Sequence, residues 1–318
     1  MTHRVIRRGC AAGALAGLAL GLLGCVPLDV ADPGATSPQP TPRAAVPEPS
    51  QASRDLMTFY TRYEQRQLTS GLLRTDGGGV DTPYTARQLA ENFERIALFD
   101  EYTLRGGRFV AQQTESRLRR WKGPVRIRPA FGRSVSEAQK TRDRAELETY
   151  VARLARVTGA DIRTSVRGAN YHVLFLNIDE LRAAGPILRD LVPDISDAIV
   201  RDITEMDRLT FCSVYAISDS ETPNDYETAL AIIRAEHPDL LRQGCIHEEI
   251  AQGLGLANDS RDARPSIFND DDEFALLTSH DEQLLRILYD ARLTPGLTPD
   301  EARPLVQQIA AERMGGGS

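Results

Sequence analysis

Two acidic residues and a glutamine share one predicted helix with a spacing that metal chemistry can use. The hydrophobic pattern predicts a short helix from His247 to Gln252, which following glycines end. Residues four apart lie on one helix face, so Glu248 and Gln252 are expected to be neighbours. Such a pair can offer two ligands to one ion, with the next residue, Glu249, placed as a general base.

Read from Glu248, the run Glu-Glu-x-x-Gln-x-x-Gly-Leu-x-Asn-Asp resembles the metzincin zinc-peptidase pattern HExxHxxGxxH followed by a small polar residue. The resemblance implies that Glu248, Gln252 and Asn258 occupy the three ligand positions and that Glu249 is the general base. It also implies that Gly255 is the turn glycine and that Asp259 is the small polar residue after the motif. The three ligand histidines are missing. A register that starts at His247 fails, because Ala251 would then be the second ligand.

If the three implied ligand positions converge, they present one carboxylate and two neutral amide oxygens. Zinc does not favour such a set, which suits calcium at best. The alternative that we favour is a buried polar network that fixes the helix against the following loop. No cofactor is therefore predicted. The acidic run from Asn269 to Glu273 lacks the mid-loop glycine of a calcium loop and is interpreted as solvated.

The first 24 residues have the pattern of a secretory signal. Arg4, Arg7 and Arg8 precede an uncharged run that is too short to span a membrane, and the run ends in Leu-Leu-Gly followed by Cys25. This ending resembles a bacterial lipobox, which implies that Cys25 becomes the lipidated first residue. An ordinary cleaved signal is the alternative. Val26 after the cysteine resembles sorting to the outer membrane, so we expect a lipid-anchored protein that faces the periplasm.

The net charge of the chain limits the classes of partner that it can bind. Three of the 38 basic residues and none of the 45 acidic residues lie in the expected signal, so its removal changes the net charge from −7 to −10. An acidic surface argues against nucleic acid and anionic lipid as partners.

With Cys10 removed and Cys25 acylated, Cys212 and Cys245 remain, and an oxidising compartment favours a disulfide between them. Two unrelated buried thiols are the alternative.

The remaining chain divides by composition. Residues 25–52 form a proline-rich tether, 53–115 a helical N-terminal region, 116–296 the main domain, and 297–318 a C-terminal helix and tail. Strands alternate with helices from about residue 121, a helix is expected from about Arg142 to Val157, and Tyr171 to Leu176 is expected to be a covered central strand because it is apolar on both faces. Capping boxes predict helix starts at Thr85 with Gln88, at Ser279, and at Thr298 with Glu301. The order implied by the metzincin resemblance is a strand, a long helix, three strands and the motif helix. The expected fold is α+β in three layers. The resemblance implies a metzincin-like mixed sheet with a long helix and a motif helix.

The sequence also resembles the proteobacterial lipoproteins of domain-of-unknown-function family 2927, a resemblance that supplies no activity. Three functions fit these features: a non-catalytic lipoprotein that binds a peptide or another envelope protein in a metzincin-like groove, a metal-dependent hydrolase with Glu249 as base, and a purely structural lipoprotein. Because all three histidines are missing from an otherwise matching motif, we favour the first.

The lipid anchor gives a direct prediction. No later apolar run is long enough to hold the chain in a bilayer, so a Cys25→Ser variant should move from the membrane fraction to the soluble fraction. Ultracentrifugation of cell extracts measures this. Sedimentation of the variant with membranes would contradict the prediction.

Overall fold

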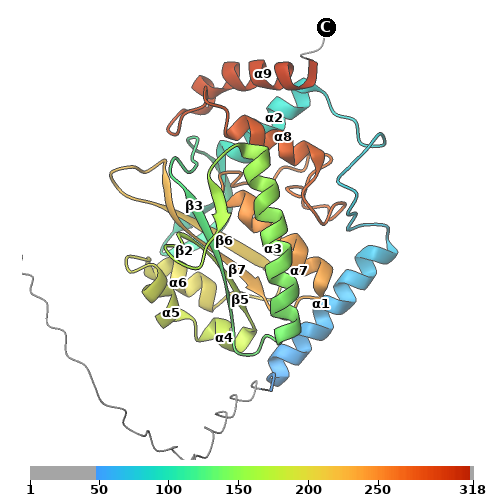
Figure 1. Cartoon of the computed structure of the whole chain (residues 1–318), viewed down its shortest axis with the longest axis vertical. Helices are drawn as coiled ribbons and strands as arrows, with labels where there is room; N and C mark the ends of the chain where they lie inside the picture. Colours follow the sequence, from blue (N-terminus) through green and yellow to red (C-terminus); the bar gives the residue numbers. More distant parts are fainter. Residues whose placement is uncertain (1–47, 316–318) are drawn as a thin grey trace, which may run out of the picture. The chain divides into compact units, whose positions relative to one another are not determined.

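A five-stranded mixed sheet organises the protein, whose computed structural model describes residues 48–315 (Figure 1). Its strands lie in the order β4-β3-β5-β7-β6. They are β3 (Val125–Phe131), β4 (Ile162–Thr164), β5 (Tyr171–Leu176), β6 (Cys212–Ser218) and β7 (Tyr226–Arg234). The first four strands in that order pair in parallel, whereas β6 pairs antiparallel with β7 at the edge.

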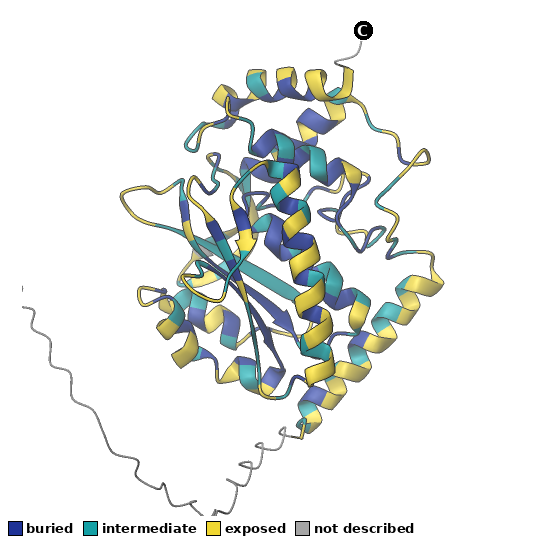
Figure 2. Ribbon diagram, viewed as in Figure 1, coloured by how far each residue is buried: buried dark blue, intermediate teal, exposed yellow. Residues whose placement is uncertain are grey.

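The central strand β5 shows why helices cover both faces of the sheet. All six of its residues are buried, and alternate side chains point to opposite faces. One face packs against α3 (Glu137–Thr158) and α7 (Asp239–Gln252). The other packs against α4 (Ile178–Arg182), α5 (Gly185–Leu191) and α6 (Asp197–Thr204). The protein is therefore a three-layer α+β structure, as predicted, and burial is concentrated on the central strands (Figure 2).

The remaining elements extend the same core. They are α1 (Gln51–Thr69), α2 (Ala86–Ala97), the hairpin of β1 (Phe99–Arg105) and β2 (Arg108–Glu115), α8 (Ser279–Leu288) and α9 (Pro299–Gly315). Buried side chains of α2 and α9 belong to one cluster with those of the sheet. The described parts of the segments 53–115 and 297–318 thus share a core with the main domain. None of the helices in residues 48–315 has the length and apolar character needed to cross a bilayer.

Two helix starts confirm the capping patterns read from the sequence. Thr85 and Gln88 form a reciprocal capping box at the start of α2. The backbone N–H and hydroxyl of Thr298 both donate to Glu301 at the start of α9. The signal, Cys25 and most of the tether lie outside the described residues.

Other helix starts correct the sequence-based boundaries. Helix α3 begins five residues earlier than expected, because Ser136 caps it. Helix α8 is capped by Thr278 with Asp281, one residue before the expected box at Ser279. Helix α7 begins at Asp239 rather than His247, so the motif occupies the last turns of a 14-residue helix.

The predicted disulfide between Cys212 and Cys245 is present, with 5.9 Å between the Cα atoms. It joins the first residue of β6 to the middle of α7. The edge strand and the motif helix are therefore held together covalently, next to the motif.

Removal of this link should destabilise the protein. The cysteines are 33 residues apart, and the chain-entropy treatment gives about 3–4 kcal/mol for a loop of this length. A Cys212→Ser/Cys245→Ser variant should lose about that free energy of unfolding in urea titrations. Equal stability of the variant and the oxidised parent would contradict this account.

Candidate functional site

Three aromatic side chains fix the end of α7 that carries the motif. Each donates a hydrogen bond to a backbone carbonyl oxygen: Tyr150 to His247 at 2.7 Å, Tyr171 to Glu249 at 2.7 Å and Trp121 to Gly253 at 2.8 Å. A Cβ atom at Gly253 would overlap the Tyr171 ring, so this glycine permits the close approach. The helix end is thereby held over β5, and its side chains at 248, 249 and 252 line a cleft.

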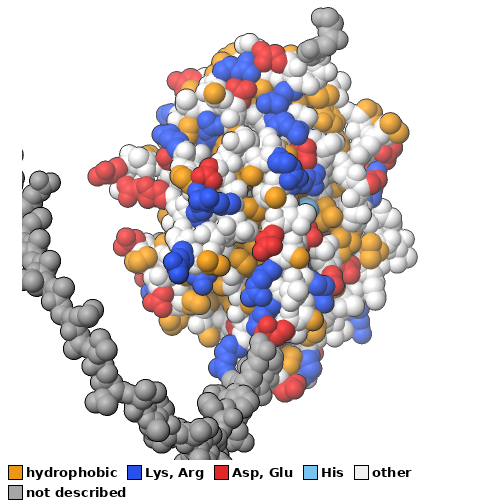
Figure 3. Space-filling view, in the orientation of Figure 1, with side chains coloured by type: hydrophobic (Ala, Val, Ile, Leu, Met, Phe, Trp, Pro, Cys, Tyr) orange, Lys and Arg blue, Asp and Glu red, His pale blue; other side chains and the backbone are white. Residues whose placement is uncertain are grey.

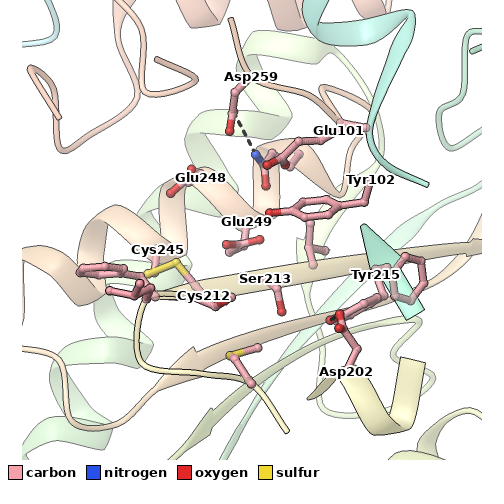
Figure 4. Close-up of a pocket in the computed structure, with 18 of the residues that line it drawn as sticks. Glu101, Tyr102, Asp202, Cys212, Ser213, Tyr215, Cys245, Glu248, Glu249 and Asp259 are labelled. Atoms are coloured by element: carbon pink, nitrogen blue, oxygen red, sulfur yellow. Dashed lines mark hydrogen bonds between the residues drawn. A yellow bond between two sulfur atoms is a disulfide. The ribbon is translucent and has the colours of Figure 1, made fainter. Parts of the chain in front are cut away.

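The cleft has a volume of about 920 Å³ and lies between β6, α7, α6 and the β1–β2 hairpin (Figure 4). Ten acidic and three basic side chains line it. Acidic and basic side chains are interspersed on the face that α3 covers (Figure 3). The cleft is thus much more acidic than that face, and it should favour cationic ligands.

Four acidic side chains in the cleft form what we name the carboxylate cluster: Glu101 of β1, Glu248 and Glu249 of α7, and Asp259 of the loop that follows (Figure 4). Among the described residues, none of the four forms an ion pair with a Lys, Arg or His side chain. Asp259 accepts a hydrogen bond from Gln252 Nε2 at 3.3 Å. Glu249 is 3% exposed, and its Oε2 has no hydrogen-bond partner.

Burial and mutual repulsion favour the protonated forms of these carboxyl groups. Burial, followed by the charge of Glu101, raises the pKa of Glu248 to about 8. Burial, followed by the charges of Glu248 and Asp259, raises the pKa of Glu249 well above its ordinary value. Burial also raises the pKa of Asp259, with Glu248 as the largest charged cause. The cluster can hold protons, a cation or the hydrogen-bond donors of a ligand.

His247 faces away from the cleft. Its ring stacks on Tyr150 with centroids 3.9 Å apart. The backbone N–H of Leu277 donates to Nδ1 at 3.0 Å, so Nε2 carries the proton and donates to Glu146 Oε1, also at 3.0 Å. Burial lowers the pKa of His247, which agrees with a neutral ring. Both ring nitrogens are engaged, and the residue anchors the loop before α8.

The resemblance implies that Asn258 is the third ligand, but the structure does not place its side chain in the cleft. Its side chain is fully buried and donates to the carbonyl oxygen of Arg95 at 2.8 Å, at the end of α2. The neighbouring Asp259 lines the cleft instead. The chain turns at Gly255, whose φ of +130° and contact with the Arg119 carbonyl oxygen exclude a side chain there. Glu248, Gln252 and Asp259 thus line the cleft, whereas Asn258 does not.

The disulfide changes which groups near the cluster can bind a metal. The Cys212 sulfur and carboxylate oxygens of Glu248 and Glu249 lie within 4.8 Å of one another. A disulfide sulfur is not a thiolate, so this cysteine is not available as a ligand. The acidic run at 269–273 has structural contacts: Tyr63 and Gln67 donate to Asp272, and Glu273 pairs with Arg264. Phe268 is buried in the core.

Glu101 could not be predicted as a member of the site from the sequence. It lies on the hairpin, far from the motif in the chain, and only the packing of β1 over the end of α7 brings it to the cluster. Tyr102, beside it, also lines the cleft and is 50% exposed. Two acidic and two aromatic residues, Phe99 to Tyr102, precede the Gly106-Gly107 turn. This pattern indicates a hairpin and points to no particular site.

The fold and site define an α+β protein with an acidic cleft between an edge strand and a helix. The chain belongs to the family described as "Protein of unknown function (DUF2927)", whose match covers residues 86–308. The match includes β1, the sheet, α7 and most of α9. No curated protein and no solved structure matched the chain.

Burial raises the pKa of Glu249 in the folded state, so the unfolded chain loses this proton first and the folded state should lose stability as pH rises above 4.5, the ordinary glutamate pKa, towards the raised pKa. With EDTA present, Glu249→Gln should be more stable than the parent by about 1–3 kcal/mol at pH 8, and about equal to it at pH 4. Urea titrations at the two pH values measure this.

The matched control is Glu227→Gln, which changes an exposed glutamate on β7. It should leave stability within about 0.5 kcal/mol of the parent. A Glu249→Gln variant that is no more stable than the parent at pH 8 would show that the buried carboxylate has a partner.

Proposed function

We propose that this protein is a non-catalytic binding protein of the cell envelope that captures an extended, basic polypeptide segment in the acidic cleft. The observation that carries the proposal is the free edge of β6. Within residues 48–315 this strand pairs with β7 on one side only, and all seven of its residues are partly exposed. An unpaired edge offers backbone donors and acceptors to an added strand.

The position of the edge supports this use. Residues 212–216 of β6 line the cleft, opposite the motif turns of α7. A segment that pairs with β6 would therefore lie beneath the carboxylate cluster. Six further acidic side chains line the cleft outside the cluster, against three arginines, so the preference for a basic segment does not depend on the cluster alone.

The β1–β2 hairpin adds a third wall. Its turn contacts α6, because Arg201 donates to the carbonyl oxygen of Gly107 at 3.0 Å, and the Phe109 ring lies 6.1 Å from the Tyr215 ring of β6. Most of β2 is exposed. The hairpin therefore crosses the cleft with few core contacts, as a wall that adapts to a ligand would do.

The resemblance to metzincins supports a groove without catalysis. The resemblance implies a strand, a long helix, three strands and the motif helix, whereas the chain has four strands and three short helices between α3 and α7. Glu248 and Gln252 stand where the resemblance implies histidines. Under this proposal Cys25 carries a lipid anchor, and the tether lets the cleft reach partners near the membrane.

A labelled heptapeptide of alternating lysine and valine tests the proposal. In EDTA at low salt it should bind the full chain, and added salt should weaken the binding. A version N-methylated at alternate residues lacks the N–H donors along one edge of the peptide. A version with glutamate in place of lysine has the opposite charge. Fluorescence polarisation should show that each binds at least about tenfold more weakly, a difference of about 1.4 kcal/mol.

Two matched variants test the place of binding. Tyr102 lines the cleft, whereas Val166 is 81% exposed on the loop after β4, outside it. Tyr102→Ala should weaken peptide binding and Val166→Ala should not. Equal affinity for the N-methylated and unmodified peptides would rule out pairing with β6.

A further inference from the structure

The two adjacent glutamates at the end of α7 have no neutralising partner within residues 48–315. Glu249 is 3% exposed with Oε2 unpartnered, and its neighbour Glu248 forms no ion pair there either. The ionised neighbours that act most strongly on both are other carboxylates. Buried charge of one sign is costly unless a proton or a cation compensates it.

The spacing of these oxygens matches one ion. Carboxylate oxygens of Glu248 and Glu249 lie within 4.8 Å of each other. Calcium binds oxygen at about 2.3–2.6 Å, so two oxygens on one calcium ion are at most about 5 Å apart. Asp259 lies on the same wall of the cleft, where Gln252 holds it by a hydrogen bond.

We propose that Glu248 and Glu249 together bind one hard divalent cation of the calcium class, with Asp259 of the same wall adding negative charge beside it. The nearest sulfur is tied in the disulfide, and both nitrogens of His247 are engaged on the far side of the helix. The site therefore offers oxygen ligands, which calcium accepts in number and irregular arrangement and which zinc does not prefer. Waters in the cleft would complete the coordination.

Asp259, and not Asn258, lines the cleft, and this changes the chemistry expected of the site. The sequence register gave one carboxylate and two amides, a set with weak attraction for any divalent ion. The structure gives three carboxylates on one wall, with Glu101 facing them from β1. A bound cation would reduce the repulsion among the four acids of the carboxylate cluster.

Isothermal titration of calcium chloride into the full chain, purified in detergent and stripped with EDTA, tests the proposal. One calcium ion should bind per chain and raise the melting temperature. Magnesium should bind more weakly, because it demands a smaller, more regular octahedron. Glu249→Gln should weaken calcium binding at least about tenfold, and Glu248→Gln/Glu249→Gln should abolish it.

Asp271→Asn is the matched control. Asp271 is an exposed carboxylate in the acidic run, and it does not line the cleft. This variant should bind calcium as the parent does. If the double variant does not fold, Glu248→Gln takes its place and should also weaken binding at least about tenfold.

Absence of calcium binding, calcium binding that survives Glu249→Gln, loss of binding in Asp271→Asn, or tighter binding of zinc than of calcium would each overturn the proposal. The titration contains no peptide, and the peptide assay contains EDTA. Failure of the cation site would therefore leave the test of β6 intact, and the reverse also holds.

Discussion

The attachment of α7 to the sheet is the constraint on which the site depends. Tyr150, Tyr171 and Trp121 donate to carbonyl oxygens in and just after the last turns of this helix. These bonds come from α3, β5 and the segment before β3. They fix the rotation of α7, so the same helix presents His247 to the interior and two glutamates to the cleft.

The disulfide and this attachment act on the same element from two sides. The aromatic donors hold the core side of α7, and Cys245 ties its cleft side to the start of β6. The cleft therefore has one rigid wall, whereas strand β2 of the hairpin opposite it is largely exposed. A rigid acidic wall with an unpaired strand edge and an adaptable cover suits capture of an extended ligand.

The sequence was most informative where local rules decide the structure. The capping boxes of α2 and α9, the fully buried strand β5 and the disulfide all follow from short patterns or from the compartment. The spacing of the motif correctly placed Glu248 and Gln252 in one helix that ends before the turn at Gly255. Beyond it, carbonyl oxygens at the end of α2 capture Asn258, about 160 positions away in sequence. Contacts at that distance, like the approach of Glu101, leave no local pattern in the sequence.

The central claim is that the free edge of β6 is where this protein binds its ligand. Amide hydrogen exchange, measured with and without the lysine–valine heptapeptide, tests it within one molecule, because the sheet has a second edge strand, β4. The account predicts slower exchange in β6, Cys212–Ser218, and no change in β4, Ile162–Thr164. Unchanged exchange in β6, or equal slowing in both strands, would contradict it.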